Sequence, residues 1–221
     1  GNTIAWIYLQ RRFQVPTERI ADTMKLAIVS IEDKRFAEHN GVDLQGTLTG
    51  LAGYLKGAVD TRGGSTIEQQ YVKNFNLLVN ARTEAERQAA VETTPTRKLR
   101  EIRMALALSK TLTKPEILTR YLNLVPFGNG AYGIQDAART YFGINAADLN
   151  WQQDALLAGL VQSTSALNPY TNPEGALERR NLVLDTMIQN LPEYADDLRA
   201  AREQPLGVLP RPSAVPQGCI A

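Results

Sequence analysis

Two adjacent carboxylates, Glu32 and Asp33, follow an apolar stretch near the start of the chain. Three side chains further along, Arg35, Phe36 and His39, would share a helix face with the first carboxylate if the helix continued. A general base needs a carboxylate that is partly shielded from water, because burial raises its pKa. This segment is therefore a candidate for acid/base chemistry, although charged residues at an ordinary helix end explain the same pattern.

A second segment pairs flexible glycines with amide and ammonium groups. Gly63 and Gly64 precede a helix start for which the spacing from Ser65 to Glu68 predicts a capping box. Free backbone N–H groups at a helix start suit an anion. The side chains that could reach such an anion are Gln69, Gln70 and Lys73. The spacing of a Walker A loop is missing, which disfavours a nucleotide but allows a pyrophosphate, and a capped helix with no ligand fits the same residues.

A third segment is basic. Arg97, Lys98 and Arg100 lie beside Glu101 and could hold a diphosphate, while Glu101 could pair with one of them or act as a second functional carboxylate. Arg180 lies on a late helix that otherwise packs in the core. Surface salt bridges would produce the same pattern at both places.

Composition narrows the remaining chemistry. The 221 residues include 24 basic and 23 acidic ones, without a long run of either sign, so bulk charge gives no case for nucleic-acid binding. One cysteine and one histidine exclude an internal disulfide and the usual zinc sites. No apolar run approaches the roughly 20 residues that span a bilayer. Because the chain begins without methionine, we expect a membrane anchor upstream.

Apolar spacing predicts a mainly α domain of eight or so helices, with almost no convincing strands. Residues 80–96 are polar and predict a surface excursion. The first expected helices are 17–31, 44–59, one opened by Ser65, one resuming at Leu99 and one opened by a Thr113–Glu116 capping box. Three more are expected at 132–142, stopped by Gly143, at 151–161 behind an Asn150 cap, and at 173–189 behind an Asn172 cap. After residue 191 a proline-rich stretch is typical of a linker.

In this order the segments resemble glycosyltransferase family 51, found in class A penicillin-binding proteins and monofunctional transglycosylases. The matching motifs are Glu32-Asp33-x-x-Phe36-x-x-His39-x-Gly41, Gly63-Gly64-Ser65-Thr66-Ile67-x-Gln69-Gln70-x-x-Lys73-Asn74, Arg97-Lys98-x-x-Glu101, a fourth from Lys114 through Tyr121-Leu122-Asn123 to Gly143, and a fifth from Ala155 to Leu184. The resemblance covers about residues 17–189.

The resemblance implies a lysozyme-like, two-lobed helical fold with a smaller lobe that faces the membrane. It implies lipid II as acceptor and the growing lipid-linked glycan strand as donor, with inversion and release of undecaprenyl pyrophosphate. Glu32 matches the family's general base and Glu101 its second carboxylate, which could orient cations or a Mg²⁺ or Mn²⁺ ion. No organic cofactor is implied. Candidate substrate contacts are Asp33, Phe36, His39, Ser65, Gln69, Gln70, Lys73, Arg82, Arg97, Lys98, Arg100, Tyr121, Asn123 and Arg180.

The chain departs from the family pattern in one residue and in the length of one segment. Glu68 stands where threonine is usual, and the segment before the basic motif is long, which leaves the matching of Arg82 open. The family's arrangement also gives the apolar stripe from Leu44 to Val59 a second reading, in which part of it faces the bilayer rather than the core.

The expected organisation has three parts. Residues 1–16 would connect to an upstream anchor, residues 17–191 would form the glycosyltransferase domain, and residues 192–221, with Cys219, would lead to a transpeptidase domain. The resemblance implies that the domain lies on the extracytoplasmic face of the bacterial cytoplasmic membrane, where cell-wall synthesis proteins are possible partners.

Two other functions fit parts of the pattern. A lysozyme-like hydrolase or lytic transglycosylase would also be helical with a leading catalytic glutamate, but it needs no pyrophosphate site. An inactive scaffold could bind lipid II without reacting. The basic motif favours synthesis over cleavage.

Overall fold

The computed structural model describes residues 5–6, 12–46, 64–213 and 218–219, and it is mostly helical, as the sequence predicts. The chain divides into two compact units, one formed by residues 1–27 and 125–221 and the other by residues 28–124. Among the described residues, no helix is both long enough and apolar enough to cross a membrane. The predicted helix over 44–59 falls mainly outside the described residues, which show helix at 44–46 only.

Helix α1, Asp22–Glu32, begins later than the sequence suggested. Residues Thr17–Arg19 form a separate 3-10 turn, so the prediction of one helix from residue 17 was wrong. The apolar spacing nevertheless identified core residues correctly, because Met24, Ala27 and Ile28 are buried. The helix ends at Glu32, and turns follow it rather than further helix.

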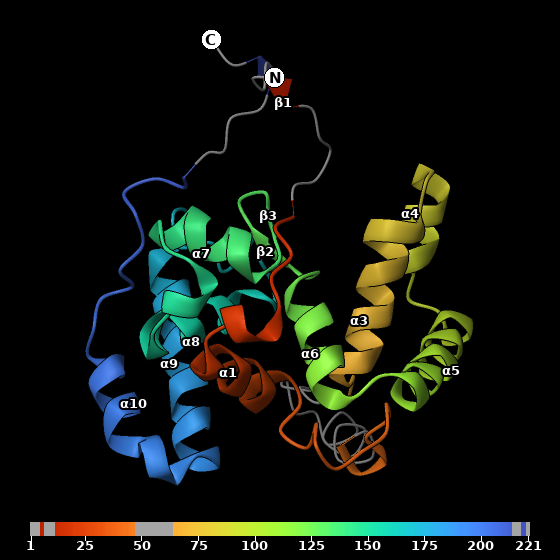
Figure 1. Ribbon diagram of the computed structural model, residues 1–221, viewed down its shortest axis with the longest axis horizontal. Helices are drawn as coiled ribbons and strands as arrows, with labels where there is room; N and C mark the ends of the chain where they lie inside the picture. The colour runs from red at the N-terminus through yellow and green to blue at the C-terminus, as the bar shows by residue number, and fades with distance from the viewer. Residues whose placement is uncertain (1–4, 7–11, 47–63, 214–217, 220–221) are drawn as a thin grey trace. The chain divides into compact units, whose positions relative to one another are not determined.

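The unit of residues 28–124 is built around α3, Ile67–Phe75, which packs against α5 and α6 (Figure 1). A π-helical turn at Asn76–Asn80 prolongs α3. The remaining helices of this unit are α4 (Glu84–Val91), α5 (Pro95–Thr111) and α6 (Lys114–Leu122). The capping box of Thr113 and Glu116 at the start of α6 is confirmed.

One local prediction in this unit was wrong, and two others were incomplete. The cap of α3 is Thr66, whose hydroxyl accepts a hydrogen bond from the backbone N–H of Gln69, so Ser65 and Glu68 form no capping box. Residues 80–96 lie at the surface as predicted, but they include α4, and Pro95 opens α5 instead of ending a loop. On α5 the apolar spacing points to solvent, since Leu99 is 62% exposed.

The other unit contains a helical layer of α8 (Trp151–Leu160), α9 (Pro173–Asn190) and α10 (Ala195–Arg202), which pack on one another (Figure 1). Side chains of Asn150 and Asn172 cap α8 and α9, as predicted. Helix α10 packs through buried Leu198 and Ala201, so helical structure continues beyond residue 191, where the sequence suggested a linker.

Helix α7, Ile134–Phe142, ends at Gly143, whose φ of 73° is the left-handed conformation predicted for this stop. A short antiparallel hairpin of β2 (Pro126–Gly128) and β3 (Ala131–Tyr132) precedes it. Short 3-10 turns lie at Ala146–Asp148 and Pro192–Tyr194. Strands β1 (Ala5–Trp6) and β4 (Gly218–Cys219) pair antiparallel.

Candidate active site

The carboxylate of Glu32 lies at the last position of α1, half-buried, where a helix α3 side chain holds it. Gln70 Nε2 donates a hydrogen bond of 2.8 Å to Glu32 Oε2. Tyr121 on α6 donates its hydroxyl proton to Gln70 Oε1 at 2.9 Å. Because the tyrosine occupies the amide oxygen, the NH₂ end of Gln70 must face the carboxylate. Three helices thus fix the direction of one carboxylate oxygen.

Tyr121 remains a donor at every working pH. It is fully buried, and this burial, reinforced by the negative charges of Glu32 and Asp33, raises its pKa well above the usual 10. A phenol that stays protonated keeps Gln70 in a single amide orientation. Gln70 and Tyr121 were predicted as substrate contacts, and in the structure they also form the hydrogen bonds that hold Glu32.

Asp33 anchors the segment after α1 to the start of α3. Its carboxylate accepts the backbone N–H of Ile67 at 3.0 Å and lies 2.9 Å from His39 Nε2 through both oxygens. Desolvation raises the pKa of Asp33, while the bonds from His39 and Ile67 oppose that rise. Phe36 is buried nearby, with its ring 6.3 Å from that of His39.

Turns, rather than a helix face, bring this first motif together. Because α1 stops at Glu32, the prediction that Arg35, Phe36 and His39 share a helical wall with it was wrong. Arg35 turns away to pair with Asp43. Gly41 permits the chain to return, since its φ is 90° and a Cβ there would lie 2.7 Å from the Ala105 carbonyl oxygen.

A cationic cluster forms beside α3. Lys98 Nζ donates to Ser65 Oγ and to Gln69 Oε1, each at 2.7 Å, and lies 3.9 Å from Glu101 Oε2. Desolvation lowers the pKa of Lys98, and the positive charges of Arg97 and Lys73 add to that effect while Glu101 opposes it. Arg97 pairs with the buried carboxylate of Glu101.

Adjacent residues of α3 therefore serve two groups: Gln70 holds Glu32, and Gln69 holds Lys98. A half-buried carboxylate can accept a proton, and clustered cations can stabilise negative charge on a departing phosphate. This combination suits the transfer of a group from a phosphate to a hydroxyl.

Other predicted site residues lie apart from this cluster or have structural tasks. Arg100 lines a shallow groove on α5 with Leu99 and Arg103, not the face that carries Lys98. Arg82 is exposed ahead of α4. Asn123 is buried, and its amide donates to the Thr119 carbonyl at the end of α6.

Arg180, predicted as a substrate contact, binds backbone carbonyls in this structure. Its side chain is fully buried in the unit that holds α9 and α10, and its guanidinium donates to three backbone carbonyls at the end of α10 and just after it. The acceptors are the carbonyl oxygens of Arg202, Gln204 and Pro205, at 2.6 to 3.1 Å. This cation on α9 therefore satisfies backbone carbonyls at the end of the neighbouring helix α10 and just after it.

No role was predicted for Lys114, and Glu68 was expected only to cap a helix. Glu68 is fully buried, and its Oε1 accepts a hydrogen bond of 2.7 Å from Lys114 Nζ. Atoms of Asp33, His39 and Glu68 that could bind a metal lie within 4.8 Å of one another. The departure from threonine at position 68 was the available signal, but the partner 46 residues away could not be read from spacing.

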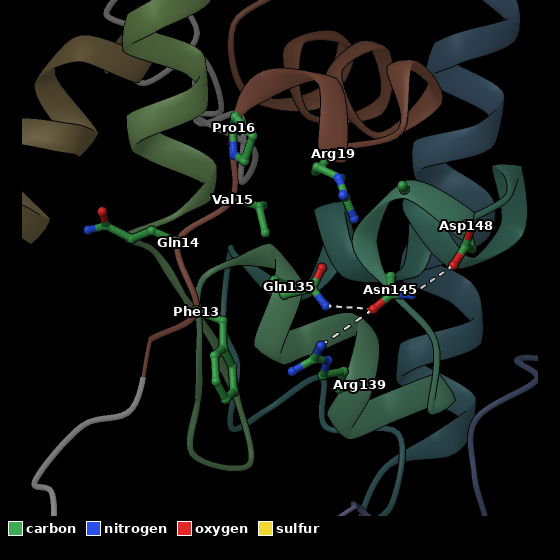
Figure 2. A pocket seen from close by; sticks show the side chains of 10 residues that line it. Phe13, Gln14, Val15, Pro16, Arg19, Gln135, Arg139, Asn145 and Asp148 are labelled. Carbon is green, nitrogen blue, oxygen red and sulfur yellow. Dashed lines mark hydrogen bonds between the residues drawn. The ribbon is translucent and has the colours of Figure 1, made fainter.

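A hollow of about 470 Å³ lies in the other unit, between the segment 13–16 and α7 (Figure 2). Its polar groups bind one another: Gln135 Nε2 lies 3.0 Å and Arg139 3.5 Å from Asn145 Oδ1. None of the predicted site residues lines this hollow. The candidate active site is therefore the cluster in residues 28–124.

Comparison with known proteins agrees with these motifs. A transglycosylase family profile matches residues 1–188. Penicillin-binding protein 1A of Streptococcus oralis is 41% identical over 184 residues, which are 83% of this chain and 28% of that protein. Penicillin-binding protein 1A of Pseudomonas aeruginosa is 39% identical over 208 residues, 93% of this chain and 24% of the relative. The chain thus spans about a quarter of the length of these proteins.

A shorter relative and a solved structure complete the comparison. A protein of Cupriavidus necator named as a transglycosylase is 38% identical over 175 residues, which cover 79% of this chain and 70% of that protein. The crystal structure of penicillin-binding protein 1A from Haemophilus influenzae matches 90% of this chain and 18% of its own with a TM-score of 0.50 and 20% identity, so the two share a fold. Motif order, fold and the family match over most of the length agree, and the chain belongs to the transglycosylase family.

Proposed function

We propose that this domain is a peptidoglycan glycosyltransferase that joins lipid II units into glycan strands. The observation that carries the proposal is the Glu32 carboxylate, held by Gln70 on the same helix whose Gln69 holds the cationic cluster of Lys98. Family membership supports the reaction class. The proposed substrate is a disaccharide on undecaprenyl pyrophosphate, which supplies both a hydroxyl to deprotonate and a phosphate leaving group.

In the proposed reaction, Glu32 takes the proton from the 4-hydroxyl of the acceptor sugar. That oxygen forms a bond to the anomeric carbon of the donor as the bond from that carbon to the pyrophosphate oxygen breaks, which inverts the centre. The pyrophosphate leaves with the electron pair of that bond. Because a pyrophosphate is a good leaving group, it needs cations more than it needs a proton donor, and Lys98, Arg97 and Lys73 have the required charge.

Roles for the remaining predicted residues follow from their positions. We assign Ser65 and Gln69 to positioning Lys98, since both accept from its ammonium. Glu101 orients Arg97 within the same cluster. Any contact of Arg82 or Arg100 with the lipid diphosphate remains a proposal, tested by whether their alanine variants raise the KM for lipid II.

A divalent cation is proposed only as a companion of the substrate. Glu101 is already paired with Arg97, so the chain's own cations neutralise it. A Mg²⁺ or Mn²⁺ ion near Glu101 would therefore arrive with the pyrophosphate oxygens, where it would offset part of their negative charge. We also propose that the domain works at the extracytoplasmic face of the bacterial cytoplasmic membrane, where such lipid-linked substrates would be met, beside other cell-wall synthesis proteins.

The test offers the protein two substrates in parallel. With lipid II in detergent, we expect release of undecaprenyl pyrophosphate and the appearance of glycan polymer, read by gel and mass spectrometry. With preformed glycan, we expect no shortening. Shortening of glycan without pyrophosphate release would overturn the proposal in favour of a lysozyme-like hydrolase, and binding of lipid II without product would favour the inactive scaffold.

A further inference from the structure

An ion pair with a buried carboxylate lies beside the first motif. Glu68 on α3 is fully buried, and Lys114 at the start of α6 supplies the ammonium that its Oε1 accepts at 2.7 Å. The same ammonium lies 4.2 Å from the centre of the Phe36 ring. A carboxylate with no exposure is strongly unfavourable without a cation, so this pair is interdependent.

The ion pair faces His39, which lies between two carboxylates. Nε2 of His39 is 2.9 Å from Asp33, while Nδ1 is 4.0 Å from Glu68 Oε1. Within the described part of the chain, His39 Nδ1 and Glu68 Oε2 are buried and have no hydrogen-bond partner. Since the Asp33 carboxylate accepts the Nε2 proton, the orientation of the ring places its other nitrogen toward Glu68.

Asp33, His39 and Glu68 are arranged like the ligands of a metal site, but the cation beside them is the Lys114 ammonium. Asp33, His39 and Glu68 offer ligand atoms within 4.8 Å of one another, and a carboxylate bound to the far nitrogen commonly orients a metal-binding histidine. The ammonium of Lys114, however, already neutralises Glu68. A divalent ion added beside it would place three positive charges against two carboxylates in a buried site.

Asp33 connects the group of Asp33, His39 and Glu68 to the proposed base, Glu32. Asp33 follows Glu32 directly, and it accepts the N–H of Ile67, the first residue of α3. Gln70, which holds Glu32, lies one turn further along this helix. A shift of His39 would release Asp33 and change the approach of Glu32 to Gln70.

We propose that Glu68 and Lys114 are positioning residues for the transfer reaction, in which the Lys114 ammonium takes the place of a metal ion and fixes His39 against Asp33. This inference rests on the proposed function. It assigns a task to the glutamate that replaces the usual threonine, and it makes Glu68 dependent on Lys114.

A double-mutant cycle tests this dependence with Glu68→Thr, Lys114→Met and the two combined. We expect Lys114→Met to lower kcat by roughly 10- to 100-fold, the usual effect of removing a group that orients a site residue, with little change in KM for lipid II. Glu68→Thr should cost less. The double variant should return to within about fivefold of wild type, because no buried charge is left unpaired. Glu84→Thr, at an exposed glutamate 3.5 Å from Arg87, is the matched control and should match wild type.

The single histidine supplies a readout that a merely structural role would not change. In ¹⁵N-edited NMR the ring signals of His39 need no assignment. We expect them to be unaffected by Zn²⁺ in wild type and in Glu68→Thr, and to shift in Lys114→Met, where the carboxylate lacks its cation. Independent effects in the cycle, or Zn²⁺ binding at His39 with Lys114 present, would overturn the inference.

The two proposals fail in different ways. If Lys114→Met does not fold, Glu68→Thr and the double variant still decide the matter, since a double variant far below Glu68→Thr contradicts the pairing. If wild type polymerises lipid II while the cycle shows no coupling, only the positioning proposal fails. If wild type makes no glycan, the proposed function itself fails.

Discussion

At the scale of single residues, the partner of Glu32 matters as much as its burial. Gln70 is a neutral donor, so its 2.8 Å bond orients the carboxylate without neutralising it. Glu101 pairs with Arg97 and Glu68 with Lys114, and both of these carboxylates are buried. Glu32 is only half-buried. A substrate hydroxyl can reach a partly exposed carboxylate more easily than a buried one, which favours Glu32 as the base.

We expect Tyr121→Phe to loosen this hold. Without the phenol, Gln70 can turn its amide, and the lost hydrogen bond corresponds to about 1 kcal/mol, or a roughly fivefold lower kcat. Steady-state polymerisation rates check this, with the half-exposed Tyr194→Phe as a control at a tyrosine outside the site. An unchanged kcat in Tyr121→Phe would show that Gln70 does not need the phenol.

Metal removal probes the cationic cluster. Because Arg97, Lys98 and Lys73 remain after chelation, we expect EDTA to lower the polymerisation rate by less than about tenfold, with recovery on adding Mg²⁺. The initial rate in matched buffers measures the effect. Complete loss of activity in EDTA would instead indicate a resident metal.

The sequence identified these residues but not the contacts between them. Residue types and order identified Glu32, Lys98 and Glu101 as candidates, because motif spacing is a property of the chain. Which side chain holds another depends on packing between helices. The hydrogen bonds from Tyr121 to Gln70 and from Gln70 to Glu32 were therefore not predictable, since Tyr121 and Gln70 are 51 positions apart in the sequence.

At the scale of elements, caps and stops were predicted well where one side chain decides them. Asn150, Asn172 and Gly143 have the expected positions. Errors arose where two caps were available or where apolar spacing does not reveal which face is buried. Thr66 rather than Ser65 caps α3, and the buried residues of α5 are Glu101 and Ala105 instead of its leucines.

Arg180 provides a test at this scale. Replacing it with alanine leaves three carbonyls near α10 without their donor, and we expect a loss of about 2–4 kcal/mol in the free energy of unfolding. Denaturant titration measures this loss, and activity per folded molecule should be kept. A normal unfolding midpoint with a raised KM for lipid II would restore Arg180 as a substrate contact.

At the scale of the whole molecule, one buried acid should make stability depend on pH. Asp154 on α8 is fully buried, and desolvation raises its pKa well above the usual value, while the Thr23 hydroxyl opposes the rise. The folded protein therefore binds this proton more tightly than the unfolded chain, whose aspartates titrate near 3.9. The stabilising contribution is full below that pH and is lost as pH rises toward the folded pKa.

Asp154→Asn should remove this dependence. Between about pH 4 and pH 7 the free energy of unfolding of wild type should fall relative to that of the variant, with a slope of up to about 1.4 kcal/mol per pH unit. Urea titrations at several pH values measure both proteins. Parallel curves would show that Asp154 binds no extra proton in the folded state.

Replacing the proposed base by Glu32→Gln tests the whole proposed reaction. Glutamine keeps the size and the polar contact of the side chain but cannot accept the acceptor's proton. We predict a folded protein with an unchanged thermal midpoint, normal lipid II binding and a polymerisation rate lower by roughly 10²-fold or more. A near-normal rate of undecaprenyl pyrophosphate release from Glu32→Gln would show that Glu32 is not the base.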